Sequence, residues 1–204
     1  MNSRIIAAQC VRFAAFCLFI GVVLAAVLSA APLEARELTD IFGRKVVVPD
    51  YIKRAYATSP PATYMLYTID PTILAGLNTP VRDWEKKFLR KEMQGLPVLG
   101  GWYGQGYVPN IEMVLQVNPQ IIIVPSLSSV IDVRTNQTLK NVHIPAVSVT
   151  IDKLSSYPEA FTRLGEALGR KDRGKELSEY ARKTIVQIAG IVNTIPEGRR
   201  PSVY

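Results

Sequence analysis

The residues with the most evident binding chemistry lie in a glycine-rich and aromatic segment, Gly101–Tyr107. Its rings are Trp102, Tyr103 and Tyr107, and Gln105 lies among them. Aromatic rings can present flat apolar faces to a bound molecule, while glycines let the backbone approach it closely. These four side chains are therefore candidates for ligand contact, with burial in a hydrophobic core as the alternative. The segment lacks the G-x-G-x-x-G spacing of a dinucleotide-binding loop.

Residues for catalysis or metal binding are scarce. Both cysteines, Cys10 and Cys17, lie in residues 1–35, and His143 is the one histidine of the chain. A zinc site normally uses several His or Cys ligands, and a histidine-dependent triad would have to rest on His143 alone. The G-x-S-x-G pattern of a nucleophile elbow is also missing. We therefore expect no metal site, no resident cofactor and no enzymatic activity, with His143 in a loop or at a strand edge.

The first residues have the pattern of a secretory signal peptide. Arg4 and Arg12 give a positive start, Phe13–Val27 is apolar and uncharged, and small residues follow at which a peptidase could cut: Ser29, Ala30, Ala31 and Ala35. We expect a signal peptide over residues 1–35 and a periplasmic location. An uncleaved membrane anchor is the alternative, because the apolar run approaches the roughly 20 residues that span a bilayer.

Length and charge limit the remaining possibilities. A chain of 204 residues with 48% hydrophobic and 20% charged content is typical of a globular protein of one or two domains. Without Arg4, Arg12 and Glu34, 22 of the 24 basic and 16 of the 17 acidic residues remain, which favours anionic partners or surfaces. The basic residues are scattered in pairs, so we expect no nucleic-acid partner. We expect a monomer.

The elements that would position these residues alternate between strands and helices. A hairpin is predicted over Glu37–Pro49; strands are predicted at Arg54–Thr58, Leu96–Leu99, Ile121–Val124 and Ala146–Ile151; helical segments are predicted at Ala62–Tyr67, from Asp70, at Ile111–Val117, at Val130–Lys140 and at Pro158–Leu168. This order predicts an α/β fold with a small parallel sheet flanked by helices. The β-branched run Ile121–Val124 is typical of a strand buried on both faces.

Ligands of open parallel sheets bind beyond the carboxyl ends of the strands. Ser59, Trp102 and Ser126 all follow predicted strand ends. Ser59 and Tyr64 are therefore candidates for ligand contact, with a helix cap or the core as alternatives, and Ser126 is a further candidate. Weaker candidates in the same segments are Thr63, Tyr67, Ser128 and Arg134.

A long helix is predicted over Asp172–Ile195, where apolar residues recur every three or four positions. It would be roughly 36 Å long at 1.5 Å per residue. Pro196 and Gly198 end it, and a new strand is expected from Arg200. We therefore divide the chain into an α/β ligand-binding lobe (36–170), a linking helix (171–196) and the start of a second lobe (197–204), which would make it a truncated form of a longer protein.

Several stretches resemble the periplasmic binding proteins of ABC importers for iron-siderophores, haem and cobalamin. They are Leu38–Arg44 with Val46–Pro49 and Ile52–Arg54, then Leu96–Gly100, Pro109–Glu112 and Val117–Ile123. Gln120 departs from the family's usual aspartate, a change from which we expect little consequence. The long predicted helix is similar to the helix that joins the two lobes in this family.

The resemblance implies that the chain captures a metal chelate, such as a ferric siderophore, haem or cobalamin, and delivers it to an ABC permease in the inner membrane. It places Gly101–Tyr107 against the ligand and Glu112 against arginines of the permease. For Glu112, stabilisation of a helix N-terminus is the alternative. A stand-alone lobe that acts as a sensor or interaction module without transport activity is the alternative function.

Overall fold

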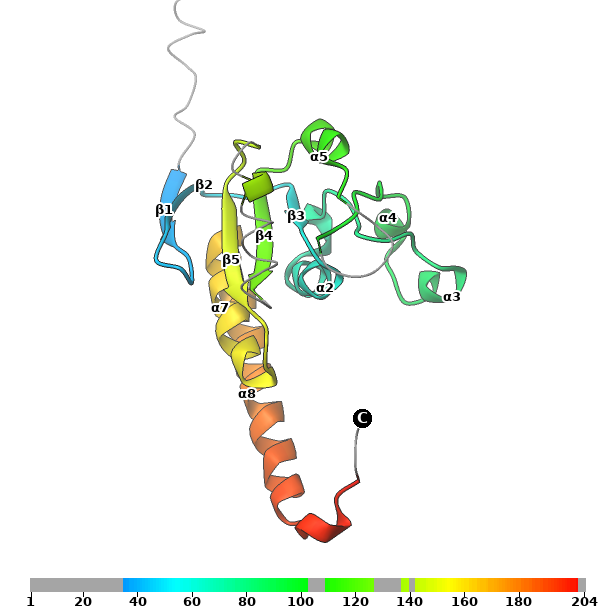
Figure 1. Ribbon diagram of the computed structural model, residues 1–204, viewed down its shortest axis with the longest axis vertical. Coiled ribbons are helices and arrows are strands. Elements are labelled where there is room, and N and C mark those ends of the chain that lie inside the picture. The colour runs from blue at the N-terminus through cyan, green and yellow to red at the C-terminus, as the bar shows by residue number, and fades with distance from the viewer. Residues whose placement is uncertain (1–34, 103–108, 127–136, 140–141, 202–204) are drawn as a thin grey trace, which may run out of the picture. The chain divides into compact units, whose positions relative to one another are not determined.

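The computed structural model describes residues 35–102, 109–126, 137–139 and 142–201 (Figure 1). Residues 35–204 form a compact unit distinct from residues 1–34. Strands and helices alternate along this unit, and a small parallel sheet is flanked by helices and followed by a long one. The predicted α/β class is confirmed.

The unit begins with the predicted hairpin, formed by β1 (Ala35–Thr39) and β2 (Lys45–Pro49). Its turn is held by the buried carboxylate of Asp40, which accepts hydrogen bonds from the backbone N–H of Phe42 (2.9 Å) and of Arg44 (3.0 Å). Gly43 has a φ of 73°, a conformation that glycine adopts without strain. The Arg44 guanidinium bonds the other Asp40 oxygen and also Ser148 Oγ (2.9 Å), so the hairpin is fastened to the parallel sheet.

The parallel sheet has the order β3 (Ala55–Ala57), β4 (Ile121–Ser126) and β5 (Ala146–Thr150). Ala57 lies opposite Ile123, and Ser126 lies opposite Thr150. Residues 121–124 are at most 1% exposed, which confirms burial of this strand on both faces.

Alternate residues along the strands belong to two hydrophobic clusters, one on each face of the sheet. Ile121 and Ile123 belong to the larger cluster, which α2 (Pro60–Ile69) and α7 (Tyr157–Leu168) cover. Ile122 belongs to the smaller cluster, which includes Val114 of α5 (Ile111–Val117). The sheet is therefore the middle of three layers.

Helix α8 (Lys171–Asn193) confirms the predicted long helix, and its 23 residues span roughly 35 Å. It packs against α7 where Gly165 meets Gly174, because a Cβ built on Gly165 would lie 2.7 Å from the Gly174 Cα. Beyond Ser178, no residue of α8 is buried. The C-terminal part of α8 extends past the end of the sheet (Figure 1).

The prediction of a strand at Leu96–Leu99 is wrong. Val98 forms only an isolated parallel bridge with Leu77, and Pro97 cannot donate a ladder hydrogen bond. The helical segment expected from Asp70 is a single 3₁₀ turn, η1 (Pro71–Ile73).

Two short helices, α3 (Asp83–Lys86) and α4 (Lys91–Gln94), were not predicted. Further 3₁₀ turns, η2 (Leu154–Ser156) and η3 (Glu197–Arg199), precede α7 and follow α8. Arg200 and Pro201 form no strand, and the rest of the strand expected there lies outside the described residues. Of the predicted helix over 130–140, residues 137–139 are described, and they are helical.

Candidate ligand-binding site

The residues predicted to follow strand ends meet at the carboxyl edge of the parallel sheet. Ser59 comes two residues after Ala57, which lies opposite Ile123, and Ser126 is the last residue of β4. The backbone N–H of Trp102 donates to the carbonyl of Thr58 at 2.9 Å. Trp102 therefore reaches this edge without following a strand of the sheet. The resulting edge carries an aromatic ring and hydroxyl groups from three separate segments.

A buried hydrogen-bond network holds the backbone before Trp102. Tyr56, with no exposed surface, donates its hydroxyl to the Gly100 carbonyl at 2.6 Å. Asn78 Nδ2 donates to the same carbonyl (2.8 Å) and to the Ala57 carbonyl (2.9 Å). Asn78 Oδ1 in turn accepts from the Thr63 hydroxyl at 2.6 Å. Every polar atom of the Asn78 amide is thus engaged, which fixes the loop on the end of β3.

Burial also fixes the protonation state of Tyr56. Desolvation raises its pKa well above the ordinary value for tyrosine, with the neighbouring Asn78 acting in the opposite direction. The hydroxyl therefore remains a neutral hydrogen-bond donor. The rings of Tyr56 and Trp102 lie with their centroids 6.4 Å apart and their planes at 51°, within the usual range for tilted aromatic pairs.

Gly101 allows the loop to lie against β3. A Cβ at this position would meet the Thr58 carbonyl at 2.8 Å and Asn78 Nδ2 at 3.1 Å. The sequence predicts that the glycines of this segment let the backbone approach a ligand closely. For Gly101 this interpretation is wrong, because its free space is taken up by the protein's own strand end.

The predicted contact residues differ in their environments. Trp102 is half-buried and packs against the smaller hydrophobic cluster, which was the alternative for this segment. Tyr64 is 55% exposed on α2, and Ser126 is half-buried at the end of β4. Tyr103, Gln105 and Tyr107 lie outside the described residues, as do Ser128 and Arg134. Whether any of these side chains touches a ligand stays a prediction.

Ser59 performs the capping role that the sequence left open as its alternative. It has no exposed surface, and its hydroxyl accepts from the Ala62 N–H at 3.4 Å. The Thr63 N–H is bonded to the Ser59 carbonyl, and the first two helical positions are prolines without N–H groups. The first four positions of α2, 60–63, therefore offer no free backbone donor to an anion, unlike many helix N-termini.

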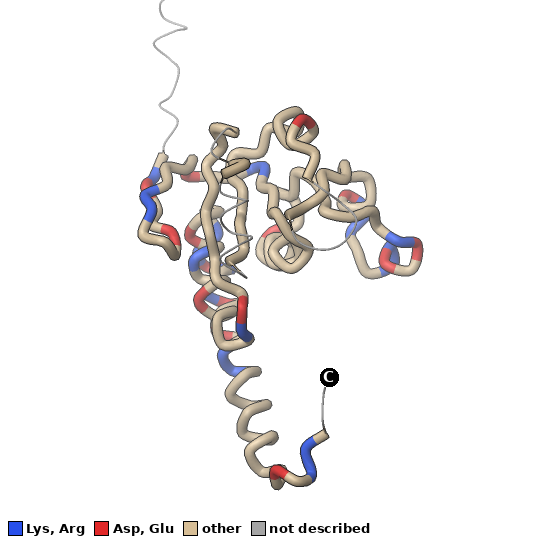
Figure 2. Tube along the Cα trace, viewed as in Figure 1, with Lys and Arg blue, Asp and Glu red and all other residues tan. Residues whose placement is uncertain are grey.

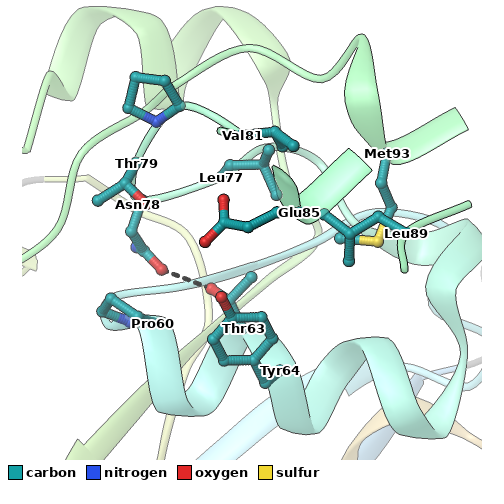
Figure 3. A pocket seen from close by; sticks show the side chains of 11 residues that line it. Pro60, Thr63, Tyr64, Leu77, Asn78, Thr79, Val81, Glu85, Leu89 and Met93 are labelled. Atoms are coloured by element: carbon teal, nitrogen blue, oxygen red, sulfur yellow. Dashed lines mark hydrogen bonds between the residues drawn. The ribbon is translucent and has the colours of Figure 1, made fainter. Parts of the chain in front are cut away.

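A small cavity lies between α2 and the α3–α4 segment (Figure 3). The Glu85 carboxylate points towards Asn78 and Thr63, and Tyr64, Leu89 and other side chains complete the lining. Its volume of about 30 Å³ matches the space of one water molecule. A chelate cannot enter this cavity.

A larger cavity, of about 210 Å³, lies at the carboxyl end of β5, beside the hairpin turn. Thr150, Ser155 and Ser156 contribute hydroxyl groups to its lining, and Arg163, paired with Glu159 at 2.7 Å, borders it. We did not predict these residues, although the polar run after the predicted strand at Ala146–Ile151 was a usable signal. The volume is below the 300–1,000 Å³ typical of small-molecule sites, so it fits only part of a chelate.

Gln120 is more important than its sequence position suggested. Its Oε1 accepts from the backbone N–H of Lys53 (2.7 Å) and of Arg54 (3.2 Å), and its own N–H donates to the Arg54 carbonyl (2.9 Å). Gln120 therefore ties the start of β3 to the start of β4. That its difference from the family's usual aspartate has little consequence stays a prediction, because a carboxylate can also accept bonds from backbone N–H groups.

The remaining candidates lie away from this edge. Glu112 is exposed in the first turn of α5, and His143 is exposed in a loop with a φ of 51°, as predicted for a loop residue. In the described part of the chain, His, Cys, Asp and Glu form no group of three or more that could hold a metal ion. None of the described helices is both long and apolar enough to cross a bilayer.

A three-layered α/β lobe that continues into one long helix is also the architecture of known solute-binding proteins. The solute-binding protein of an ABC transporter from Sulfurospirillum deleyianum is 35% identical to this chain, with a TM-score of 0.76 over 83% of the chain and 53% of that protein. The predicted resemblance to the solute-binding proteins of ABC importers is confirmed. No protein-family model and no curated protein matches the chain.

More distant structures share the fold. The periplasmic molybdate-binding protein MolA of Haemophilus influenzae is 20% identical, with a TM-score of 0.62 over 81% of this chain and 56% of MolA. The siderophore-binding protein BauB, solved with two acinetobactin molecules and ferric iron, is 16% identical, with a TM-score of 0.61 over 80% of this chain and 56% of BauB. The chain thus spans about half the length of the solved proteins it resembles.

Proposed function

We propose that this chain is the ligand-binding lobe of an extracytoplasmic solute-binding protein that captures a metal chelate for an ABC permease. The observation that carries the proposal is the convergence of Trp102 and Ser126 at the carboxyl edge of the parallel sheet. Ligands of open α/β sheets bind at this edge. The similarity to an ABC-transporter solute-binding protein supports the transport role. The more distant neighbours include both a siderophore complex and a molybdate-binding protein, so the choice of a chelate rests on the chemistry of the edge itself. None of these comparisons favours a stand-alone sensor.

The edge is better suited to a large, ring-containing ligand than to a small free anion. Trp102 offers an aromatic face on a backbone that Tyr56 and Asn78 already hold in place, so little ordering cost is paid on binding. Positions 60–63 at the start of α2 have no free N–H group for an oxyanion. A ferric siderophore, haem or cobalamin fits these features.

The test uses the two tryptophans of the chain, Trp84 and Trp102, as separate reporters. Trp84→Phe leaves only Trp102 at the proposed site, and Trp102→Phe leaves only Trp84 on α3. Each folded variant is titrated with haem, cobalamin and ferric siderophores, with free tryptophan amide as the control for light absorption. We expect strong saturable quenching in Trp84→Phe. In Trp102→Phe we expect weaker quenching and a higher dissociation constant, because energy transfer to these coloured ligands falls with distance and the proposed contact is lost. Equal responses from both variants, or none from either, would contradict the proposal.

Delivery to a permease is the second part of the proposal. Glu112 is exposed, and its charge is placed to pair with a basic partner surface. Glu112→Lys should weaken binding to the permease in proteoliposomes while chelate binding stays unchanged. Glu197→Lys, an exposed acidic residue in the first turn of η3, is the matched control. Equal effects of both substitutions would show that only general charge matters.

A further inference from the structure

The α3–α4 segment, residues 82–92, presents two aromatic rings outward. Trp84 is 60% exposed and Phe88 is 69% exposed, and neither belongs to the two hydrophobic clusters. The opposite side of the same turn carries Glu85 and Leu89, which line the small cavity against α2 (Figure 3). The segment thus turns a carboxylate inward and its two largest apolar side chains outward. Folding of the lobe does not account for that orientation.

Basic side chains surround the two rings. Residues 82–92 contain Arg82, Lys86, Lys87, Arg90 and Lys91, and the acidic residues Asp83, Glu85 and Glu92. Both signs of charge are visible on this segment in Figure 2.

The acidic groups of the segment are already engaged. Asp83 pairs with Lys86 at 2.7 Å, Glu92 pairs with Arg90 at 3.6 Å, and Glu85 accepts from the backbone N–H of Arg82 at 2.8 Å.

Two lysines of the segment remain available to an external anion. Within the described residues, Lys87 and Lys91 form no ion pair with a carboxylate. The Lys87 Nζ lies 4.9 Å from the centroid of the Phe88 ring, a cation–π geometry that keeps the charge beside the apolar surface. An external anionic surface would therefore meet exposed rings and unpaired positive charge at the same place.

We infer that this outward face of residues 82–91 binds an anionic phospholipid surface. Tryptophan and other amphipathic rings are favoured at the level of lipid headgroups, and lysine and arginine beside them are attracted to anionic lipids. Single-stranded nucleic acid, which also uses rings and basic residues, is bound along a positively charged groove. Here the rings lie on the outside of a short helix, and the cavity of the segment is on its inner side. The geometry favours a membrane surface.

This contact is distinct from ligand capture. The rings involved lie on α3 and the turn after it, whereas the proposed ligand site lies at the carboxyl edge of the sheet. A weak attraction to the membrane would keep an exported binding lobe close to the bilayer in which a permease lies. Its failure would leave the proposed ligand binding untouched, because the two are measured with different variants.

The experiment measures binding of residues 35–204, which form a compact unit of their own, to vesicles by co-sedimentation. One set of vesicles is phosphatidylcholine, and the other is phosphatidylethanolamine with phosphatidylglycerol. We expect binding to the anionic vesicles that weakens with added salt, and little binding to phosphatidylcholine. In Trp102→Phe, in which Trp84 is the remaining tryptophan, the emission should shift to shorter wavelength on binding. Equal binding to both vesicle types, or no binding, would overturn the inference.

Variants separate this face from other exposed apolar surface. Lys87→Gln and Lys91→Gln should each lower the partition coefficient about fivefold, and the double change Trp84→Ser with Phe88→Ser should lower it more than tenfold. Tyr180→Ser with Val186→Ser on α8 is the control, because these side chains are 71% and 67% exposed. Circular dichroism confirms that each variant is folded. An equal loss of binding in the α8 control would show that any exposed apolar surface causes the binding. Binding to an oligonucleotide but not to vesicles would show that the face binds nucleic acid instead of a membrane.

Discussion

The two tryptophans of the chain lie in opposite environments. Trp102 follows a backbone fixed by Tyr56 and Asn78, and its ring packs against the smaller hydrophobic cluster. Trp84 lies on the four-residue helix α3, is 60% exposed and has no place in either cluster. The same residue type is thus held by the fold in one region and left to solvent in the other.

The difference separates a region held by buried hydrogen bonds from one held by few contacts. Around Trp102 the buried polar groups are satisfied by one another, so a change to Tyr56 or Asn78 should cost stability and also disturb the backbone that presents the Trp102 ring to the proposed ligand. Around Trp84 few contacts would be lost, so a change there should alter only an external interaction. Measured changes in the free energy of unfolding can therefore test whether each tryptophan region is held by the core or lies on an exposed surface.

The largest contrast is expected from removal of one ring in each region. Tyr56→Ala removes a ring without exposed surface together with its bond to Gly100, and should lower the free energy of unfolding by about 3–5 kcal/mol. Trp84→Ala should change it by less than about 0.5 kcal/mol. Urea denaturation followed by circular dichroism measures both. Similar losses in the two variants would show that the α3 region is part of the core.

A smaller effect is expected from a single methyl group. Gly101→Ala places a Cβ 2.8 Å from the Thr58 carbonyl, closer than real contacts allow, and should cost about 1–3 kcal/mol in unfolding free energy. Gly95→Ala, next to the exposed aromatic segment, has no atom within 4 Å of its Cβ and should cost nothing measurable. Thermal unfolding of the two variants is the measurement. A tolerant Gly101 would mean that the loop is not held against β3.

The sequence predicted the layers of this fold because they rest on local patterns. The β-branched run Ile121–Val124 and the apolar spacing of the long helix both specify an element without knowledge of its neighbours. The places of Ser59 and Ser126 followed from the order of strands and helices, whereas Trp102 reaches the same edge through its backbone bond to Thr58. The expected strand at Leu96–Leu99 failed because an isolated apolar run of four residues fits a bridge as well as a strand.

The rest of the site depends on contacts between distant residues, which a single sequence does not reveal. Asn78 follows Gly76-Leu77 in a stretch that reads as a turn, yet its amide joins Ala57, Gly100 and Thr63. The contact between Lys87 and the Phe88 ring is not predicted from the sequence for a similar reason. Only the orientation of α3, with Glu85 inward, shows that the rings face solvent.

A change of intermediate size in the free energy of unfolding is expected from removal of the Gln120 side chain. Gln120→Ala leaves the backbone N–H groups of Lys53 and Arg54 without their acceptor and should lower the free energy of unfolding by about 1–2 kcal/mol. Gln116→Ala, an exposed change on α5, is the matched control and should be neutral. Urea midpoints measure both. A neutral Gln120→Ala would show that these hydrogen bonds add nothing measurable to stability.

The smallest expected effect on stability comes from removing one negative charge. Asp70, in a partly buried ion pair, is compared with Asp83, in an exposed one. Partial burial acts to raise the pKa of Asp70, but hydrogen bonds from Thr72 and the ion pair with Arg170 outweigh it and hold the pKa below its usual value of 3.8. The pair is 2.9 Å long, and both side chains are less than 20% exposed. Asp70→Asn keeps the shape of the group and removes its charge.

Because the pKa of Asp70 is lowered in the folded state, its charge stabilises the fold above about pH 4, and this contribution is lost as the pH falls through the lowered value. At pH 7, Asp70→Asn should therefore lower the free energy of unfolding by about 0.5–1 kcal/mol, and the difference from the parent should shrink towards zero below pH 3.8. Asp83→Asn in the exposed α3 pair should show no measurable difference at either pH, because solvent screens that pair. Urea unfolding at pH 7 and pH 3 distinguishes the two. A pH-independent cost at Asp70 would mean that packing and not charge joins α2 to the start of α8.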